Sequence, residues 1–469
     1  MRSMLVVLVL GGCSSPEDAP LVRPEVVFAC DTFECVPPPT TPPTLGDPDA
    51  GLEVLRNGDL MKCGVPLDTF ESLMPFLGEV TLLEGRTGDG ANIPYEYAVG
   101  TSERGARVVS FSCFDCHASE FDGELVLGMG DHLAGLGSGL AGVALAKTLT
   151  SDPDELIELD VFEAVLEVMD PYTPDTRGLS AGNSSMMAVA ARRDPLTSNW
   201  LDEPHMEPPD GGVPYNVPAW WTTKYKHALF ANSVARGNHT NFALNPAHVC
   251  TESPEAMEDV LALGPDLAAY IVSIEEPVWP WGIDDALADQ GQDVFEATCA
   301  GCHGTYRDGV VDFPNVVVPI EVIDTDPWAA EQQPVWQRAW DEHFSINPFG
   351  EGMEWAPQAG YMAPPLVGLW ASAPYFHNGA APTLADVIDS AARPAIWRRA
   401  SLDSGDYDQE AVGWNIEVLD TPKDSIDDPA ERYEVYDTSR RGYGNTGHPF
   451  GDGLDDGERE ALLEYLKTL

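Results

Sequence analysis

Apolar residues recur at the helical period in separate stretches of the chain. The clearest stretch covers residues 152–169, where Asp152 stands at an N-cap position. The apolar face of this stretch carries Leu156, Phe162, Val165, Leu166 and Met169. A second stretch covers residues 255–274 and ends before Pro277, because proline cannot continue a helix. The pattern predicts two helices in the first half of the chain.

The second half of the chain begins and ends with an amphipathic pattern. Leu287, Val294 and Phe295 share one face of a predicted helix that runs directly into Cys299. The last predicted helix has acidic residues at its start and Lys467 in its last turn, as the helix dipole favours. Its apolar stripe consists of Leu462, Leu463, Leu466 and Leu469. The fold is therefore predicted to be mainly α, with long loops and little sheet.

The first residues have the pattern of an export signal. Arg2 is followed by an apolar run from Met4 to Leu10, and residues 10–13 resemble the cleavage box of a bacterial lipoprotein. We expect residues 1–12 to be a signal peptide and Cys13 to carry a lipid, with plain secretion as the alternative. The expected location is the periplasm, the outer membrane or the cell surface. No other apolar run approaches the ~18–20 residues that span a bilayer, so the lipid would be the only membrane contact.

Composition divides the rest of the chain into three segments. Residues 13–50 are acidic and rich in proline, and are expected to form an extended, solvated tether. Folded sequence is expected from about Gly51, at first as a small docking segment that reaches residue 92. A proline- and tryptophan-rich stretch near residue 278 separates a first domain, residues 51–278, from a second, residues 279–469.

The charge balance limits the class of partner. The 469 residues include 77 acidic and 25 basic side chains, for a net charge of −52. A negative field of this size repels nucleic acid and anionic membranes, and attracts cationic proteins or metal ions. Adaptation to salt or simple solubility is the alternative explanation. The charge argues against a nucleic-acid partner and leaves the fold open.

Two Cys-x-x-Cys-His sequences carry the clearest chemistry. They consist of Cys113, Cys116 and His117, and of Cys299, Cys302 and His303. Two thiols three positions apart reach both vinyl groups of a haem, and the histidine that follows lies under the iron as its proximal ligand. A structural zinc site needs four converging ligands, and a thioredoxin-like site would not carry histidine after both pairs. We predict two covalently bound haem c groups, one in each of two cytochrome c-like helical domains.

Four further cysteines lie outside the haem motifs and beyond Cys13. They are Cys30, Cys35, Cys63 and Cys250. An even number in an oxidising compartment predicts two disulfides, and three pairings are open. We favour Cys30 with Cys35, and Cys63 with Cys250, because the first two are close together in the tethered segment.

Longer motifs accompany the haem sites. In the second half they are the sequence from Cys299 to Tyr306 and the stretches 313–319, 324–327, 365–370, 373–379, 382–384 and 445–451. In the first half they are the stretches 217–221 and 236–239. These motifs resemble the superfamily of di-haem cytochrome c peroxidases and MauG, and especially its rubber-oxygenase-like branch. The resemblance covers most of the chain from about Gly51 and is strongest in the second half.

The resemblance implies further residues around the second haem. His448 matches the position that supplies the second axial ligand to the C-terminal haem, and Met362 is the rival ligand. His377 matches a position that lines the region between the domains, where it would contact a haem propionate. A calcium ion between the haem domains would be bound by backbone carbonyls at Ser372 and Pro374.

An enzyme of this kind needs two unequal haems. His303 with His448 suits a six-coordinate haem that transfers electrons, which leaves the His117 haem with an open position for peroxide or O₂. The candidates to cap that iron, or to act beside it as acid–base groups, are His132, His227 and His239. Trp220 and Trp221 are candidates for an aromatic bridge between the haems, with ordinary core packing as the alternative. The candidate catalytic residues are thus His239, Trp220 and Trp221.

These expectations combine into one functional hypothesis. The protein is expected to be an exported haem oxidoreductase of peroxidase-like or oxygenase-like type, with a redox protein or a small oxidant, peroxide or O₂, as its partner. A non-catalytic electron-transfer cytochrome is the alternative, and it would have two low-spin haems and no turnover.

Overall fold

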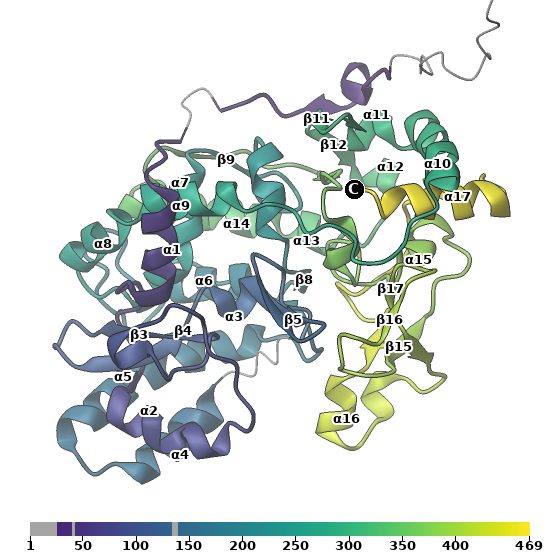
Figure 1. Cartoon of the computed structure of the whole chain (residues 1–469). Coiled ribbons are helices and arrows are strands. Elements are labelled where there is room, and N and C mark those ends of the chain that lie inside the picture. Colours follow the sequence, from purple (N-terminus) through teal and green to yellow (C-terminus); the bar gives the residue numbers. More distant parts are fainter. Residues whose placement is uncertain (1–25, 40–42, 134–138) are drawn as a thin grey trace, which may run out of the picture.

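The computed structural model describes residues 26–39, 43–133 and 139–469. These residues form two lobes that lie side by side, the first mainly purple and blue and the second mainly green and yellow (Figure 1). Helices contain 41% of the residues and strands 15%. The prediction of a mainly α fold with little sheet is confirmed.

Two crossing helices organise the N-terminal lobe. Helix α1 (Pro48–Asn57) begins at Asp47, whose carboxylate caps the first turn. Helix α9 (Gly264–Ser273) crosses it so closely that a Cβ on Gly51 would lie 2.1 Å from the Asp266 carbonyl oxygen. The two backbones touch at this point, where the absence of a side chain on Gly51 permits the close approach.

The other helices of this lobe surround the crossing. They are α2 (Leu67–Leu73), α4 (Leu140–Leu149), α5 (Pro153–Met169), α6 (Gly182–Ala191), α7 (His239–Leu244) and α8 (Pro254–Leu261). Helix α5 confirms the helix predicted over 152–169, and the Asp152 side chain accepts from the Asp154 amide. The single helix predicted over 255–274 is wrong, because the chain forms α8 and α9 with a break between them. Pro265 lacks an amide hydrogen and therefore stands in the first turn of α9.

A small antiparallel sheet leads into the first Cys-x-x-Cys-His motif. Its strands run in the order β2 (Val65–Pro66), β4 (Arg107–Phe111) and β3 (Tyr97–Thr101), and β4 is followed by helix α3 (Phe114–His117). A hairpin of β5 (Ala118–Phe121) and β6 (Glu124–Leu127) comes next. The expectation of a small docking segment over residues 51–92 is wrong, because Leu55, Leu60 and Phe70 lie in the core of this lobe.

The C-terminal lobe repeats the crossing with a shorter connection. Helix α10 (Asp285–Thr298) runs into α11 (Ala300–His303), and α17 (Asp456–Leu466) crosses α10. A Cβ on Gly291 would lie 1.8 Å from the Ala461 carbonyl oxygen. Asp455 and Glu458 close a capping box at the start of α17. Both helices that the sequence predicted for this half are confirmed.

Shorter elements complete the C-terminal lobe. The helices are α12 (Ile320–Ile323), α13 (Trp328–Glu331), α14 (Gln333–Ala339), α15 (Leu384–Ile388) and α16 (Pro429–Tyr433). The strand pairs are β10 (Thr305–Arg307) with β11 (Val310–Asp312), and β16 (Tyr407–Asp408) with β17 (Gly413–Trp414). Strand β15 (Ile396–Arg399) lies between β18 (Ile416–Val418) and β19 (Tyr436–Asp437).

The second half of the chain also packs onto the first lobe. Strand β13 (Met353–Trp355) pairs with β9 (Ala235–Gly237), and α14 lies over the N-terminal lobe (Figure 1). A short π-helix (Trp340–Phe344) inserts His343 between two histidines of the first half. His343 Nδ1 is 3.2 Å from His205 Nε2, and His343 Nε2 is 2.9 Å from His248 Nε2. His343 and His248 are buried, whereas His205 is exposed.

The segment that precedes the first lobe is attached to the second lobe. Strand β1 (Glu34–Cys35) pairs with β12 (Val316–Pro319), which in turn pairs with β14 (Gly360–Met362). Val36 is 2% exposed, and its carbonyl oxygen lies 2.7 Å from His227 Nδ1. The expected solvated tether is therefore wrong at Glu34–Val36, because backbone pairing and apolar burial hold these residues.

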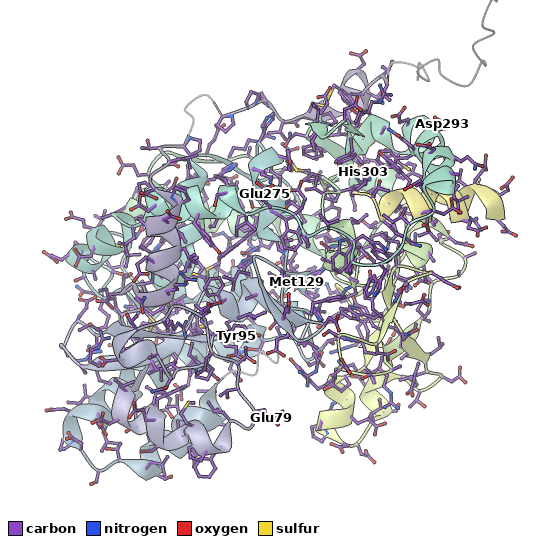
Figure 2. The ribbon with its side chains drawn as sticks, viewed as in Figure 1. Glu79, Tyr95, Met129, Glu275, Asp293 and His303 are labelled. Atoms are coloured by element: carbon purple, nitrogen blue, oxygen red, sulfur yellow. A yellow bond between two sulfur atoms is a disulfide. The ribbon has the colours of Figure 1, made fainter. Side chains whose placement is uncertain are left out.

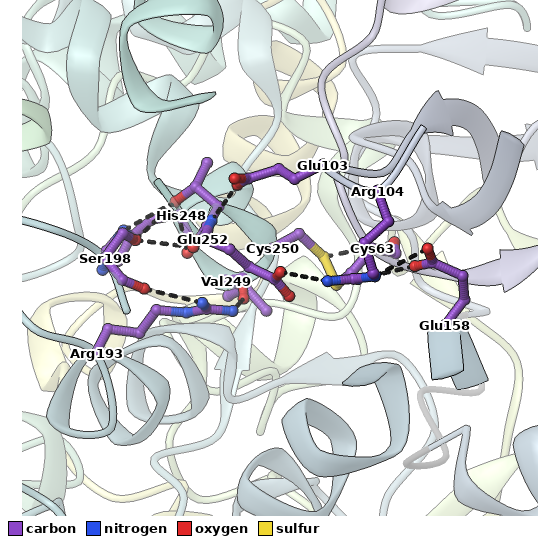
Figure 3. Close-up of a disulfide and its surroundings, with 11 residues drawn as sticks. Cys63, Glu103, Arg104, Glu158, Arg193, Ser198, His248, Val249, Cys250 and Glu252 are labelled. Carbon is purple, nitrogen blue, oxygen red and sulfur yellow. Dashed lines mark hydrogen bonds and ion pairs between the residues drawn. A yellow bond between two sulfur atoms is a disulfide. The ribbon is translucent and has the colours of Figure 1, made fainter. Parts of the chain in front are cut away.

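The two favoured disulfides are confirmed. Cys30 is bonded to Cys35, and Cys63 to Cys250. The Cys63–Cys250 bond lies beside the ion pairs of Arg104 (Figure 3). Across the described ranges, no helix combines the length and the apolar character needed to cross a bilayer. The signal peptide expected over 1–12, and Cys13, lie outside the described residues.

Candidate functional site

A cavity of about 890 Å³ lies between the two Cys-x-x-Cys-His motifs. The cysteines and the histidine of both motifs line this cavity: Cys113, Cys116, His117, Cys299, Cys302 and His303. Apolar side chains from both lobes, such as Phe162, Leu166 and Leu384, form much of the rest of the wall. The volume falls in the range of cofactor sites, and the structure therefore joins the two motifs in one continuous space.

Helices α10 and α11 fix the C-terminal motif. His303 lies in the C-terminal lobe, in the upper part of the view in Figure 2. Its Nδ1 is 2.9 Å from the Pro364 carbonyl oxygen, so Nδ1 donates and Nε2 keeps its lone pair. Burial lowers the pKa of His303, which favours the neutral ring that a metal requires. His303 is thus prepared to bind iron through Nε2.

His448 faces His303 from the loop that precedes α17. Its backbone is left-handed, with φ of 48°, directly after Gly447. The Arg393 guanidinium holds the loop by donating to the carbonyl oxygens of Asn445 and Gly447 at 2.7 and 2.6 Å. Burial lowers the pKa of His448 to about 4, and no hydrogen-bond partner meets its buried Nδ1.

The spacing of these two imidazoles fits a haem iron between them. A metal–imidazole bond is about 2.0 Å long and the ring centre lies about 1.1 Å beyond the nitrogen, so two rings on opposite sides of one metal have centres about 6.2 Å apart. The ring centres of His303 and His448 are 6.3 Å apart. The residues present therefore fit a six-coordinate haem at this motif.

The four motif cysteines are unpaired, which leaves their thiols for a covalent cofactor. Within the part of the chain that the structure describes, no group of three or more His, Cys, Asp or Glu side chains is arranged to hold a metal ion. The zinc alternative thus finds no ligand set among those residues.

The N-terminal motif has different surroundings. His117 ends α3, its ring stacks on Trp220 with centres 4.7 Å apart, and the Pro218 carbonyl faces it. Burial lowers the pKa of His117 to about 4. Burial also raises the pKa of Asp115 to about 8, with a further contribution from Asp131. The side of this site that carries His117 is therefore buried against Trp220, and the carboxyl groups of Asp115 and Asp131 lie nearby.

None of the three histidines proposed as partners of His117 lines the cavity. His132 stacks on Trp414, with ring centres 4.5 Å apart, and His227 contacts the Val36 carbonyl. His239 is buried, which lowers its pKa to about 4, and lies near His227. Among the described residues, no imidazole stands across from His117 as His448 does from His303.

Met362 and His377 both line the cavity. Met362 is buried in β14 against Val36 and Val317, in contact with the N-terminal segment. His377 stacks on Tyr361 with ring centres 4.2 Å apart, and burial lowers its pKa to about 3. His377 therefore lies in the cavity wall, and its expected contact with a haem propionate stays a prediction.

Trp220 and Trp221 join the two lobes. Trp220 packs in the N-terminal core against His117, while Trp221 is fully buried in the C-terminal core. Trp221 Nε1 donates to the Val367 carbonyl at 3.0 Å. Gly368 makes room for this contact, because a Cβ there would lie 2.6 Å from Trp221 Nε1. The pair thus connects the segments that follow the two haem motifs.

The carbonyls proposed for calcium converge on one side chain. Asn216 Nδ2 lies 3.3 Å from the Ser372 carbonyl oxygen and 2.5 Å from that of Pro374. Rotation of the Asn216 amide by half a turn would direct Oδ1 at the same place, giving three oxygen ligands of the kind that calcium prefers. In the structure the Asn216 amide donates to both carbonyls, and the calcium ion stays a prediction.

Three residues of the site were missed in the sequence. The Pro364 carbonyl contacts His303, and the Pro218 carbonyl faces His117, whose Nδ1 has no hydrogen-bond partner. Asn216 acts through its side-chain amide and lies in the short strand β8 (Tyr215–Asn216). The recurrence of an Ala/Val-Pro pair downstream of each motif, at Val217-Pro218 and Ala363-Pro364, was the available signal for the first two. No local pattern distinguishes Asn216.

Comparisons with known proteins support haem binding. The family described as RoxA-like, cytochrome c-like matches residues 360–398. Cytochrome c1 of Blastochloris viridis is 29% identical over 203 residues, which are 40% of this chain and 68% of that protein. These findings support a c-type cytochrome in electron transfer, and the cytochrome c-like family implies covalently bound haem c.

Other similar proteins add less. The uncharacterized protein y4iM of Sinorhizobium fredii is 26% identical over 238 residues, which cover 43% of this chain and 53% of that protein. The chain therefore matches about half the length of that relative. A structure of hydrazine synthase from Kuenenia stuttgartiensis, pressurized with xenon, is 16% identical, with 65% of this chain and 92% of that chain covered. Its TM-score of 0.27 is too low to indicate a shared fold.

Proposed function

We propose that this protein is a di-haem oxidoreductase of peroxidase-like or oxygenase-like type. His303 and His448 would together hold one haem, which would supply electron transfer, and His117 would hold the other, which would supply binding of a small oxidant. The observation that carries this proposal is the difference between the two motifs: one proximal histidine has an imidazole 6.3 Å across from it, and the other has none among the described residues.

The chain's own groups prepare the C-terminal site. The Pro364 carbonyl fixes the Nδ1–H tautomer of His303, and the Arg393 contacts hold the His448 loop. Two neutral imidazoles, fixed before iron binds, favour low-spin iron with little rearrangement on electron transfer. Such a site suits transfer and excludes an external ligand.

The N-terminal site is proposed to react with a small molecule, peroxide or O₂, that enters it. Haem bound there would supply binding and reduction of peroxide or O₂. Trp220 orients the His117 ring by stacking, and the apolar walls keep water away. Trp220 and Trp221 then offer a short aromatic connection from this site to the Val367 carbonyl in the other lobe.

The setting of the protein belongs to the same proposal. The net charge of −52 favours a cationic redox partner protein. Export to the periplasm or cell surface, with a lipid on Cys13, agrees with the two disulfides. A calcium ion held by Asn216, Ser372 and Pro374 would stabilise the junction of the lobes.

Spectroscopy of the purified holoprotein tests the assignment. We expect EPR and resonance Raman spectra to show one low-spin haem and one haem that binds CO when reduced. His448→Ala should convert the low-spin haem to a CO-binding form, because it removes the second axial ligand. The control His239→Ala, which changes a histidine outside the cavity, should leave both spectra unchanged. An unaltered low-spin signal in His448→Ala would refute the axial assignment.

The same spectra separate the proposal from the alternative of a non-catalytic carrier. A carrier would show two low-spin haems and no response to CO or peroxide. That result would overturn the oxidoreductase proposal while leaving electron transfer intact.

A further inference from the structure

The Arg399 guanidinium is buried and has no hydrogen-bond partner. Arg399 lies at the end of β15 in the C-terminal lobe, and its guanidinium carbon is 3.7 Å from the centre of the Trp414 ring. Its Nε, Nη1 and Nη2 atoms are all buried and none makes a hydrogen bond. A buried cation is unfavourable unless an opposite charge or hydrogen bonds compensate it, and a cation–π contact supplies only part of that compensation.

Four other arginines (Arg56, Arg193, Arg236 and Arg459) leave one buried Nε without a partner, whereas Arg399 leaves all three nitrogens without one. Arg86 donates to the carbonyls of Ile93 and Pro94, and Arg177 forms an ion pair with Glu434. The neighbouring Arg398 pairs with Glu417 and Glu431 at the surface. The unpaired guanidinium of Arg399 is therefore a feature of this position and not of the chain.

Carboxylates close enough to act on Arg399 are already occupied. Their charges raise its pKa, but burial dominates and lowers that pKa to about 10, with the Arg177 cation adding to the decrease. Asp406 accepts from Asn415, and Asp403 accepts from the Gly405 amide. Glu434 is held by Arg177. In a chain with 77 acidic residues, none of these side chains is placed on the guanidinium.

Two more polar groups without a hydrogen-bond partner lie at Trp414: the His132 ring and the Nε1 atom of Trp414 itself. His132, from the loop after β6 in the N-terminal lobe, is 4% exposed and stacks on Trp414 with centres 4.5 Å apart. Neither of its ring nitrogens makes a hydrogen bond, and burial lowers its pKa well below the usual value. Trp414 Nε1 is also buried without a partner. Buried polar groups of this kind in a native fold call for a missing partner.

The unpartnered groups share one property. A guanidinium and an indole can only donate, and a neutral imidazole donates through one nitrogen. A missing water would satisfy some donors, but it would leave the Arg399 charge without compensation. An anion on the guanidinium would satisfy its donors and balance its charge together.

We propose that Arg399, His132 and Trp414 form an anion-binding site at the junction of the two lobes, and that its ligand is a carboxylate. The planar fork of arginine matches two carboxylate oxygens, and one negative charge balances the single cation. The carboxylate comes either from a haem propionate or from a small carboxylic acid in solution. The propionate source rests on the di-haem proposal, whereas the free-acid source does not.

The test compares Arg399→Gln with Arg398→Gln in the holoprotein. Arg398 is the matched control, because it is the neighbouring residue of the same strand and makes only surface ion pairs. Thermal unfolding is measured with increasing sodium acetate, and resonance Raman spectra are recorded in the region of the haem propionate bending modes.

For a free carboxylate, the Tm of the wild type and of Arg398→Gln should rise with acetate, and that of Arg399→Gln should stay flat. For a haem propionate, acetate should have no specific effect, and Arg399→Gln alone should shift a propionate band. If Arg399→Gln matches the control in both measurements, the anion site is refuted.

A second pair of variants covers failure to fold. Arg399→Lys keeps the charge but loses the planar fork, and Arg398→Lys is its control. Arg399→Lys should weaken the acetate response or shift the propionate band, and identical behaviour of both lysine variants would refute the site. Loss of the low-spin signal in wild type would refute the di-haem proposal without touching the acetate result.

Discussion

Both lobes contain a Cys-x-x-Cys-His motif, but the elements that precede the motif and the side chain that faces its histidine differ. In the C-terminal lobe, α10 runs directly into the motif and crosses α17, and a remote loop places His448 opposite His303. In the N-terminal lobe, a sheet separates α1 from the motif, and Trp220 stacks on His117. In the proposed di-haem protein the pentapeptide would therefore determine attachment, whereas the distant chain determines which side chain faces the motif histidine.

The largest expected effect comes from removing one motif at a time. Cys299→Ala with Cys302→Ala should lower the holoprotein mass by one haem and abolish the low-spin signal. Cys113→Ala with Cys116→Ala should lower the mass equally but abolish the CO response instead. Intact-mass spectrometry and EPR check both. If either pair of substitutions removed both the low-spin signal and the CO response, the assignment of one signal to each motif would be wrong.

Acid should weaken the contact between the lobes. In the folded protein burial lowers the pKa of His343 to about 3 and lowers that of His248 as well, whereas in the unfolded chain both are about 6.5. Below pH 6.5 the unfolded chain binds more protons, so stability falls as pH decreases from about 6.5 towards about 3. At pH 5 the His343 ring alone is expected to lower the stability by about 2 kcal/mol relative to neutral pH, and His248 adds to the loss in the same direction.

Urea unfolding between pH 5 and pH 8 measures this loss. The variant His343→Phe should unfold with a shallower dependence on pH, since it removes one of the two buried groups. The variant His205→Ala, which removes the exposed end of the chain of rings, should keep most of the slope. A wild-type slope in His343→Phe would contradict the assignment of the acid effect to this contact.

The smallest effect tests whether the two helix crossings are equivalent. A Cβ added to Gly51 would lie 2.1 Å from a carbonyl oxygen of α9, and a Cβ added to Gly291 would lie 1.8 Å from a carbonyl oxygen of α17. Gly51→Ala and Gly291→Ala should each destabilise the protein by about 1–3 kcal/mol, because backbone must move to admit the methyl group. Thermal unfolding measures the change. Gly142→Ala, where a Cβ meets nothing within 4 Å, is the control and should be neutral or slightly stabilising.

Features set by neighbouring residues could be predicted from the sequence. The haem motifs, the capped helix α5 and the stripe of α17 each depend on a few adjacent positions. The break between α8 and α9 also has a local cause, and Pro265 was the signal that was overlooked. The disulfide pairing was reached by proximity of Cys30 to Cys35, which left only one partner for Cys63.

Features set by distant residues could not be predicted in this way. Strand β1 pairs with β12 across almost three hundred residues (Glu34 with Val317), and no pattern in either strand specifies the other. The contacts of His343 with His205 and His248 depend on how the lobes pack. The positions of His132 and Arg399 around Trp414 have the same origin, and the sequence could therefore offer His132 only as one of three candidates beside the N-terminal haem.

The attachment of β1 has a mechanical consequence for any anchor upstream. The Val27 carbonyl oxygen is 3.6 Å from where a Cβ would stand on Gly301, so the chain leaves the fold beside the C-terminal motif. The thirteen residues that lead from Cys13 to Val26 span at most about 45 Å when fully stretched. A lipid on Cys13 would therefore hold the side of the C-terminal lobe that carries Gly301 within that radius of the membrane.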